Sequence, residues 1–201
     1  MDHESRPRVC PKKSKRDRLI RLVTTHADWA LGFEDETWWS RLEMPSLHAW
    51  TESGQPLRMV EQSVAKGDPD PKALACYGLL VQSAHNEGSF QEGFEEVWLR
   101  FVVGRPVSGL TTAFLDWSCS KLDGLGKKVL VLVWDNASWH ISKQVRAWIR
   151  EHNRQVKANG KGVRIISCLL PIKSPWLNPI EPHWVHGKRR VVEANRLLTA
   201  Q

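Results

Sequence analysis

The sequence predicts an α/β fold in which helices cover both faces of a mixed β-sheet. The first half of the chain holds short apolar stretches with strand-like alternation, and the second half alternates helix and strand patterns. That order predicts an antiparallel meander followed by βαβ crossovers. Two runs in the second half, 128–134 and 163–170, are almost continuously apolar, which is typical of strands buried on both faces.

The first half of the chain supplies a basic segment and the meander. Residues 1–20 are polar and basic and contain two prolines, so they are interpreted as an arm or linker. Trp29, Leu31 and Phe33 alternate within 28–35, which predicts a strand. A turn at 51–56, a loop or hairpin at 83–95 and further strands near 57–64, 73–82 and 97–103 complete this half.

The second half of the chain contains residues that typically start and end helices. The segment 104–108 predicts the start of a helix that Gly124 or Gly126 ends. Ser142 is a candidate N-cap for a helix that carries apolar residues on one side. The segment 159–162, Asn-Gly-Lys-Gly, breaks that helix. A proline-rich loop at 171–179 then leads to a final helix that is expected to begin near 178.

Composition and charge indicate one soluble domain with a possible polyanionic partner. The chain has 201 residues, of which 41% are hydrophobic and 25% charged, which is ordinary for a globular protein. Residues 1–21 hold eight Lys/Arg against three acids, and positive charge collects again around residues 151–174 and 182–201. DNA would explain this distribution, and a solvated basic tail is the alternative for the N-terminal segment.

The cysteines and the apolar segments bear on location. The four cysteines are far apart in sequence, without a Cys-x-x-Cys pair, which argues against a zinc site and a disulfide framework and for a reducing compartment. The N-terminus lacks the apolar core of a signal peptide, and no apolar stretch approaches the ~20 residues that span a membrane. The sequence therefore predicts a cytoplasmic protein with no membrane partner.

Three acidic residues occupy positions where a catalytic site can form. Asp135 follows the buried strand 128–134, and ligand sites in open α/β sheets gather at the carboxyl ends of strands. Glu181 follows Pro179 at a helix start, where a carboxylate also gains from the helix dipole alone. For Asp135 the alternative is an aspartate that caps the following turn.

The third acid lies in the run Glu34-Asp35-Glu36. By period two, Asp35 shares a strand face with Leu31 and Phe33, although an acidic turn is the alternative and the run leaves open which acid binds metal. Carboxylates are the ligands that Mg²⁺ prefers, and two such ions can activate water and stabilise a leaving oxygen. Together the three acids predict a metal-dependent phosphodiesterase site.

Two segments resemble known motifs. Residues 135–140, Asp-Asn-Ala-Ser-Trp-His, and 174–181, Ser-Pro-Trp-Leu-Asn-Pro-Ile-Glu, resemble the second and third acidic motifs of DDE transposases, most of all those of the mariner-like branch of bacterial insertion-sequence transposases. Asp35-Glu36 resembles the first acidic motif, and Trp50 to Pro56 resembles the Trp-x-x-x-Gly turn of that family. The resemblance covers about residues 28–199, most strongly 129–192.

The resemblance implies a ribonuclease H-like fold with a mixed five-stranded sheet. It also implies two Mg²⁺ or Mn²⁺ ions, DNA cleavage at element ends and strand transfer into a target. By motif match, Asp35, Asp135 and Glu181 would be the catalytic metal ligands. The active-site neighbours would be Asn136, His140 near the scissile phosphate, and Asn178, which would shape the loop that aims Glu181. The alternative for His140 is a helix-start histidine packed by Trp139.

The expected organisation is a basic arm at 1–24 and a catalytic domain at 25–201, without the N-terminal helix-turn-helix region of the family. The expected partners are double-stranded DNA, both element ends and target, and a second copy of the chain on that DNA in a bacterial cytoplasm. The basic residues expected to contact phosphates are Lys173, Lys188, Arg189 and Arg190.

Two alternatives to a transposase remain open. One is a ribonuclease H-like nuclease that cuts without joining. The other is a catalytically silent DNA-binding or dimerising transposase remnant that acts as a regulator.

Overall fold

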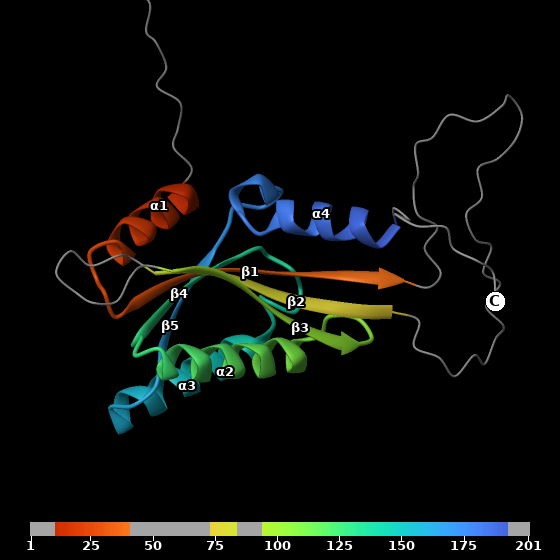
Figure 1. The fold of residues 1–201 in the computed structure, drawn as a ribbon. Coiled ribbons are helices and arrows are strands. Elements are labelled where there is room, and N and C mark those ends of the chain that lie inside the picture. The colour runs from red at the N-terminus through yellow and green to blue at the C-terminus, as the bar shows by residue number, and fades with distance from the viewer. Residues whose placement is uncertain (1–10, 41–72, 84–93, 193–201) are drawn as a thin grey trace, which may run out of the picture.

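The computed structural model describes residues 11–40, 73–83 and 94–192, which form one five-stranded sheet with helices on both faces (Figure 1). The strands are β1 (Trp29–Ser40), β2 (Ala73–Gln82), β3 (Glu95–Val103), β4 (Val129–Trp134) and β5 (Arg164–Leu169). The helices are α1 (Pro11–Val23), α2 (Ser108–Gly124), α3 (Lys143–Asn159), α4 (Glu181–Val192) and the 3₁₀ turn η1 (Pro175–Leu177). Within the described ranges, every helix is too short or too polar to cross a bilayer.

The sheet is mixed, as the sequence predicts. Its strand order is β3-β2-β1-β4-β5. The pairs β3–β2 and β2–β1 are antiparallel, and the pairs β1–β4 and β4–β5 are parallel. The parallel half arises because α2 and α3 cross over the sheet between strands, as βαβ units do. Strand β1 is central and joins the two halves, so residues on it lie between the meander and the crossovers.

Each face of the sheet buries its own apolar core. Helices α2 and α3 cover one face, where Leu115, Leu122 and Val145 pack on alternate residues of β2 and β4. Helices α1 and α4 cover the other face (Figure 1), where Val23 and Trp184 pack on the remaining residues of the strands. Burial on both faces explains why β4 is almost continuously apolar.

Helix α1 occupies most of the segment that the sequence analysis interprets as an arm. Pro11 is the first residue of the helix, a position that tolerates proline because no intrahelical N–H bond is lost there. Leu19, Ile20 and Val23 lie on its inner side and pack against the sheet. The high density of basic residues masks this short apolar stripe in the sequence.

The remaining boundaries differ by a few residues from those expected. Strand β1 continues beyond 35 to Ser40, and the last helix begins at Glu181 after the η1 turn instead of near 178. Ser142 is the N-cap of α3 and accepts a hydrogen bond from the Val145 N–H, as predicted. Gly160 ends α3 with a left-handed φ of 67°, which glycine adopts without strain. The predicted turn at 51–56 and strand at 57–64 lie outside the described residues.

Three of the four cysteines lie in the described part of the chain. Cys76, Cys119 and Cys168 are buried in the two apolar cores on either face of the sheet. Burial raises the pKa of the Cys119 thiol to about 12, so this side chain is a neutral core residue.

Candidate active site

The three acids singled out in the sequence converge at one edge of the sheet. Asp35 lies on β1, Asp135 directly follows β4, and Glu181 is the first residue of α4. Phe33 of β1 pairs with Val133 of β4 in a parallel register, so Asp35 and Asp135 each come two residues beyond this pair. The same register therefore brings both aspartates to the same level of the sheet, at the carboxyl ends of neighbouring strands.

The neighbouring carboxylates act electrostatically on Asp35. Burial, followed by the negative charges of Glu181, Glu36 and Asp135, raises the pKa of Asp35 to about 7. Burial and the charge of Asp135 also raise the pKa of Glu181, against a smaller opposing effect of Lys188. Such a set of carboxylates carries unbalanced negative charge. A hard divalent cation fits it, because carboxylate oxygens are its preferred ligands.

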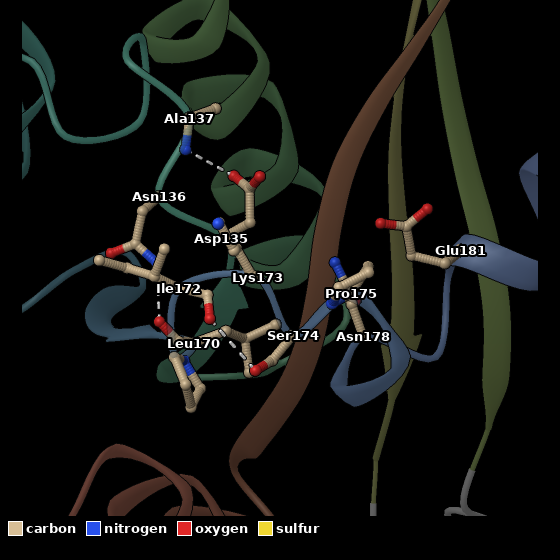
Figure 2. Close-up of a pocket in the computed structure, with 11 residues that line it drawn as sticks. Asp135, Asn136, Ala137, Leu170, Ile172, Lys173, Ser174, Pro175, Asn178 and Glu181 are labelled. Carbon is tan, nitrogen blue, oxygen red and sulfur yellow. Dashed lines mark hydrogen bonds between the residues drawn. The ribbon is translucent and has the colours of Figure 1, made fainter.

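Asp135 differs from the other two acids because hydrogen bonds hold it in its charged form. Its Oδ1 accepts a bond of 2.8 Å from the Ala137 N–H (Figure 2) and lies 2.7 Å from Nδ1 of His140. Burial opposes ionisation, but these bonds and the charge of His140 outweigh it, so the pKa of Asp135 falls below its usual value. Both contacts use the same oxygen, which fixes the orientation of the carboxylate.

The loop between β5 and α4 is tied to the two acidic strands. The Asn136 side-chain amide donates a 2.7 Å hydrogen bond to the Leu170 carbonyl, which Figure 2 shows. The Asn178 amide donates a 3.0 Å bond to the Glu34 carbonyl, next to Asp35 on β1. The Asn178 carbonyl in turn accepts the N–H of Glu181 at 3.2 Å. Asn178 therefore connects the start of α4 to β1, and in this way it shapes the loop that carries Glu181.

Two adjoining pockets open at this edge. The first has a volume of about 350 Å³ and includes Asp135, Asn136, Lys173 and Glu181 in its wall (Figure 2). The second, of about 330 Å³, is lined by residues that include Asp35, Glu181 and Lys188. Glu181 lines both pockets, so the three acids border a single continuous region of the surface.

The predicted phosphate-binding residues lie around these pockets as far as they are described. Lys173 is exposed on the rim of the first pocket and has a left-handed φ of 56°, an unusual conformation for a residue with a side chain. Lys188 is exposed on α4 beside the second pocket. Arg189 and Arg190 belong to α4, where only their backbone is described.

His140 is buried next to Asp135. The side chain is 1% exposed and stacks on Trp134 at a centroid distance of 4.7 Å. Its Nε2 lies 2.9 Å from a Glu36 oxygen and 3.1 Å from a Glu34 oxygen, while Nδ1 faces Asp135. His140 therefore neighbours the candidate site through Asp135, and its proximity to a scissile phosphate stays a prediction.

The buried acids of β1 were not identified from the sequence as a separate group. Glu34 and Glu36 alternate with Asp35, so they point to the face of α2 and α3, and both are buried. Burial and the charge of Glu36 raise the pKa of Glu34 to about 8. Burial alone would lower the pKa of His140, but the charge of Glu34 and contacts with all three carboxylates raise it instead.

Glu34, Glu36 and His140 also lie close enough together to hold a metal ion, because one ligand atom from each lies within 4.8 Å of the other two. A protonated imidazole has no lone pair for a metal, however, and it balances the buried charge by itself. We therefore assign these contacts as ion pairs. Successive side chains of a strand point to opposite faces, so the run Glu34-Asp35-Glu36 places both glutamates on the face opposite to that of Asp35.

The sheet order and the crossovers define a ribonuclease H-like fold. The solved catalytic domain of the Mos1 mariner transposase has this fold and superimposes with a TM-score of 0.50 at 14% identity, covering 99% of this chain and 78% of that one. The Mos1 strand transfer complex aligns with a TM-score of 0.47 at 12% identity and covers 99% of this chain. This chain spans 55% of the length of the Mos1 chain in that complex.

The family comparison is more specific over the C-terminal part of the chain. Residues 108–200 match the family described as DDE superfamily endonuclease, a range that contains Asp135 and Glu181 but not Asp35. A search of curated proteins gives no match. Over residues 108–200, then, the chain is similar to the DDE endonucleases, and the described residues have a ribonuclease H-like fold.

Proposed function

We propose that this protein is a DDE transposase catalytic domain that cleaves DNA phosphodiesters and transfers the resulting strand ends. The observation that supports this best is the convergence of three carboxylates, from β1, β4 and α4, on one edge of a ribonuclease H-like sheet. The match of residues 108–200 to the DDE superfamily endonucleases supports the same conclusion independently of that geometry.

In this proposal Asp35, Asp135 and Glu181 hold two Mg²⁺ or Mn²⁺ ions. When bound, such ions supply a nucleophile at neutral pH and neutralise charge that develops on the phosphate. Burial and then the charges of neighbouring carboxylates raise the pKa of Asp35, and bound cations would offset that repulsion, so the carboxylates favour binding of these ions.

The other residues of the site bind and orient. Lys173 and Lys188 lie where they can pair with phosphates on either side of Glu181, and we propose that Arg189 and Arg190 extend this surface. Asn178 and Asn136 hold the loop that carries Glu181 against the acidic strands. No side chain in this scheme forms a covalent bond with DNA, so the attacking groups are water and then a DNA 3′-hydroxyl.

The finer part of the proposal concerns the biological setting. The motifs at 135–140 and 174–181 support assignment to a mariner-like bacterial insertion sequence. We propose that the domain acts in the cytoplasm as a homodimer on double-stranded DNA, with element ends and target as substrates. A dimer would provide one set of acids for each of the two element ends.

A nicking assay tests the proposed activity. Supercoiled plasmid is incubated with the purified chain in Mg²⁺ or Mn²⁺, with EDTA as the metal-free control. Asp35→Asn, Asp135→Asn and Glu181→Gln keep side-chain shape but remove a charge, and each is expected to abolish nicking. Asp116→Asn, an exposed aspartate on α2, is the matched control and should nick like the parent.

The outcomes separate three functions. Metal-dependent nicking with joining of labelled 3′-ends to the plasmid supports a transposase domain. Nicking without joining, under conditions where the ends are supplied, favours a nuclease that only cuts. A folded chain that binds DNA but nicks nothing in either metal contradicts the enzymatic proposal and favours the silent regulator.

A further inference from the structure

Trp184 of α4 contacts Asp35 of β1 across a long separation in sequence. Its indole Nε1–H donates a 2.9 Å hydrogen bond to Oδ2 of Asp35, across 149 positions of sequence. The ring is 8% exposed and belongs to the apolar core between the sheet and helices α1 and α4. A buried indole that reaches a carboxylate of the site is the kind of neighbour that fixes a metal ligand in one orientation.

Strand β2 makes room for this ring with a glycine. Gly78 pairs directly with Asp35 in the antiparallel ladder of β1 and β2. A Cβ atom at Gly78 would lie 2.4 Å from Cη2 and 2.6 Å from Cζ2 of Trp184, well inside van der Waals contact. The indole therefore rests on the bare backbone beside Asp35, and only a residue without a side chain allows this close approach.

Helix α4 carries both Trp184 and the third acid. Glu181 and Trp184 are three positions apart, about one helical turn, so both lie toward the same side of the helix. Ile180, which is fully buried, precedes them and also comes within 3.0 Å of the Cβ position of Gly78. Any shift of α4 along the sheet would move Glu181 and the donor to Asp35 together.

We propose that Trp184 is a positioning residue that sets Asp35 relative to Glu181, with Gly78 as the surface on which its ring rests. This inference rests on the proposed function, because it concerns how the metal ligands are held. Oδ2 of Asp35 accepts a hydrogen bond from the neutral indole, so the carboxylate is oriented and keeps its negative charge. A general core role for Trp184 would need the ring but not its N–H group.

Trp184→Phe separates those two roles, because it keeps an aromatic ring and removes the N–H. The affinity of the DNA-free chain for Mn²⁺, measured by titration calorimetry, is the primary readout and needs no catalysis. We expect affinity to fall roughly 10-fold, the lower range for loss of a hydrogen-bonded neighbour of a metal ligand. Trp98→Phe is the matched control, because buried Trp98 donates 2.7 Å to Glu96, away from the site, and its loss should leave Mn²⁺ affinity unchanged.

A second pair of variants tests the glycine. Gly78→Ala should displace the indole and weaken Mn²⁺ binding at least as much as Trp184→Phe does. Gly187 also lies on α4, and no atom comes within 4 Å of a Cβ added there. Gly187→Ala is therefore the control and should bind Mn²⁺ like the parent. If Gly78→Ala leaves affinity unchanged, the packing of Trp184 on that strand does not position Asp35.

The hydrogen bond itself can be observed without relying on a foldable Trp184 variant. In ¹H–¹⁵N spectra of the parent chain, one indole N–H signal should shift strongly on Asp35→Asn, and Trp184→Phe, if it folds, should remove that signal. No indole shift on Asp35→Asn would overturn the proposal, as would equal Mn²⁺ affinity in parent and folded Trp184→Phe. A parent that binds no Mn²⁺ but shows the indole shift contradicts the metal-dependent function and leaves the Trp184 contact established as a structural bond only.

Discussion

At the scale of single residues, alternation along β1 places three consecutive acids in two environments. Asp35 faces α4 and the open pockets, while Glu34 and Glu36 point to the opposite face and are neutralised by His140. Asp135 connects the two groups, because its Oδ1 accepts from His140 while its carboxylate interacts with Asp35 across the edge of the sheet. The charge of the site therefore depends on a buried imidazole.

The raised pKa of Asp35 predicts a link between pH, stability and metal binding. Because its folded pKa is about 7 and its ordinary value is 3.8, the folded chain retains a proton that the unfolded chain loses in this range. The contribution of Asp35 to the free energy of unfolding therefore falls as pH rises through this window and is lowest above pH 7. Urea unfolding without divalent ions should show Asp35→Asn gaining stability over the parent between pH 5 and pH 8.

Mg²⁺ should reverse this effect, because a bound cation favours the charged carboxylate. In the presence of Mg²⁺ the advantage of Asp35→Asn at pH 8 is expected to shrink or vanish. A stability difference between parent and variant that does not change with pH would contradict the burial and repulsion assigned to Asp35.

His140 is predicted to be essential for stability because it balances buried charge. His140→Gln leaves the buried Glu36 carboxylate without its cation, and breaking a buried pair in this way costs about 3–5 kcal/mol of unfolding free energy. His152→Gln, which removes a ring bonded to the Val163 carbonyl at 2.8 Å, should cost only about 1 kcal/mol. Urea unfolding at pH 7.5 measures both.

The double variant His140→Gln with Glu36→Gln distinguishes charge imbalance from simple loss of packing. Removal of one buried negative charge should restore a part of the stability that His140→Gln loses. An equal or greater loss in the double variant would show that His140 acts through packing on Trp134 instead.

At the scale of elements, the helix and strand pattern of the second half is largely predictable from sequence. Strand β4 is buried on both faces and α3 has an N-cap and a left-handed glycine at its end, so local residues encode these elements. Helix α1 is not predictable in this way, because its helical state depends on the sheet against which Leu19 and Val23 pack. The final helix starts at Glu181 because η1 and the Asn178 bond to β1 terminate the loop, which is a tertiary effect.

Asn178 is predicted to couple the loop before α4 to the metal site. Asn178→Ala removes the bond to the Glu34 carbonyl and should cost about 1–3 kcal/mol of stability, because a buried carbonyl loses its donor. It should also weaken Mn²⁺ binding, since Glu181 follows directly on this loop. Calorimetric titration and urea unfolding of the same samples measure both effects.

Asn153→Ala is the matched control for this comparison. The Asn153 side chain joins α3 to β5 through two 2.8 Å bonds with Ile165, on the face away from the acids. It should lose stability while its affinity for Mn²⁺ stays at the parental value. If both variants weaken Mn²⁺ binding equally, the effect of Asn178 is a general loss of stability.

At the scale of the whole molecule, the candidate site is predictable as a set of residues but not as a geometry. Positions at strand ends and a helix start, together with the motif resemblance, indicate Asp35, Asp135 and Glu181, and the parallel register of β1 and β4 explains why the two aspartates lie at the same level. The supporting contacts from Trp184, Glu34 and Glu36 join segments more than 100 positions apart. Such contacts depend on the tertiary fold, so periodicity within a single segment cannot reveal them.

The distribution of charge over the molecule predicts how DNA binding responds to salt. If Lys188, Arg189 and Arg190 each contact a phosphate, changing all three to Gln should reduce the slope of log K against log salt by up to about 3. A triple change of Arg146, Arg150 and Lys157 to Gln, all exposed on α3, is the control and should leave the slope near the parental value. Equal slopes in parent and the α4 variant would exclude α4 from the DNA interface.

The most direct test of the account is the location of Mn²⁺ in crystals of the chain, from anomalous scattering. The account predicts anomalous peaks bounded by Asp35, Asp135 and Glu181, at the edge where the two pockets meet. A peak between Glu34, Glu36 and His140, or none beside the three acids at saturating Mn²⁺, would contradict it, because the site would then lack the ions on which the proposed cleavage depends.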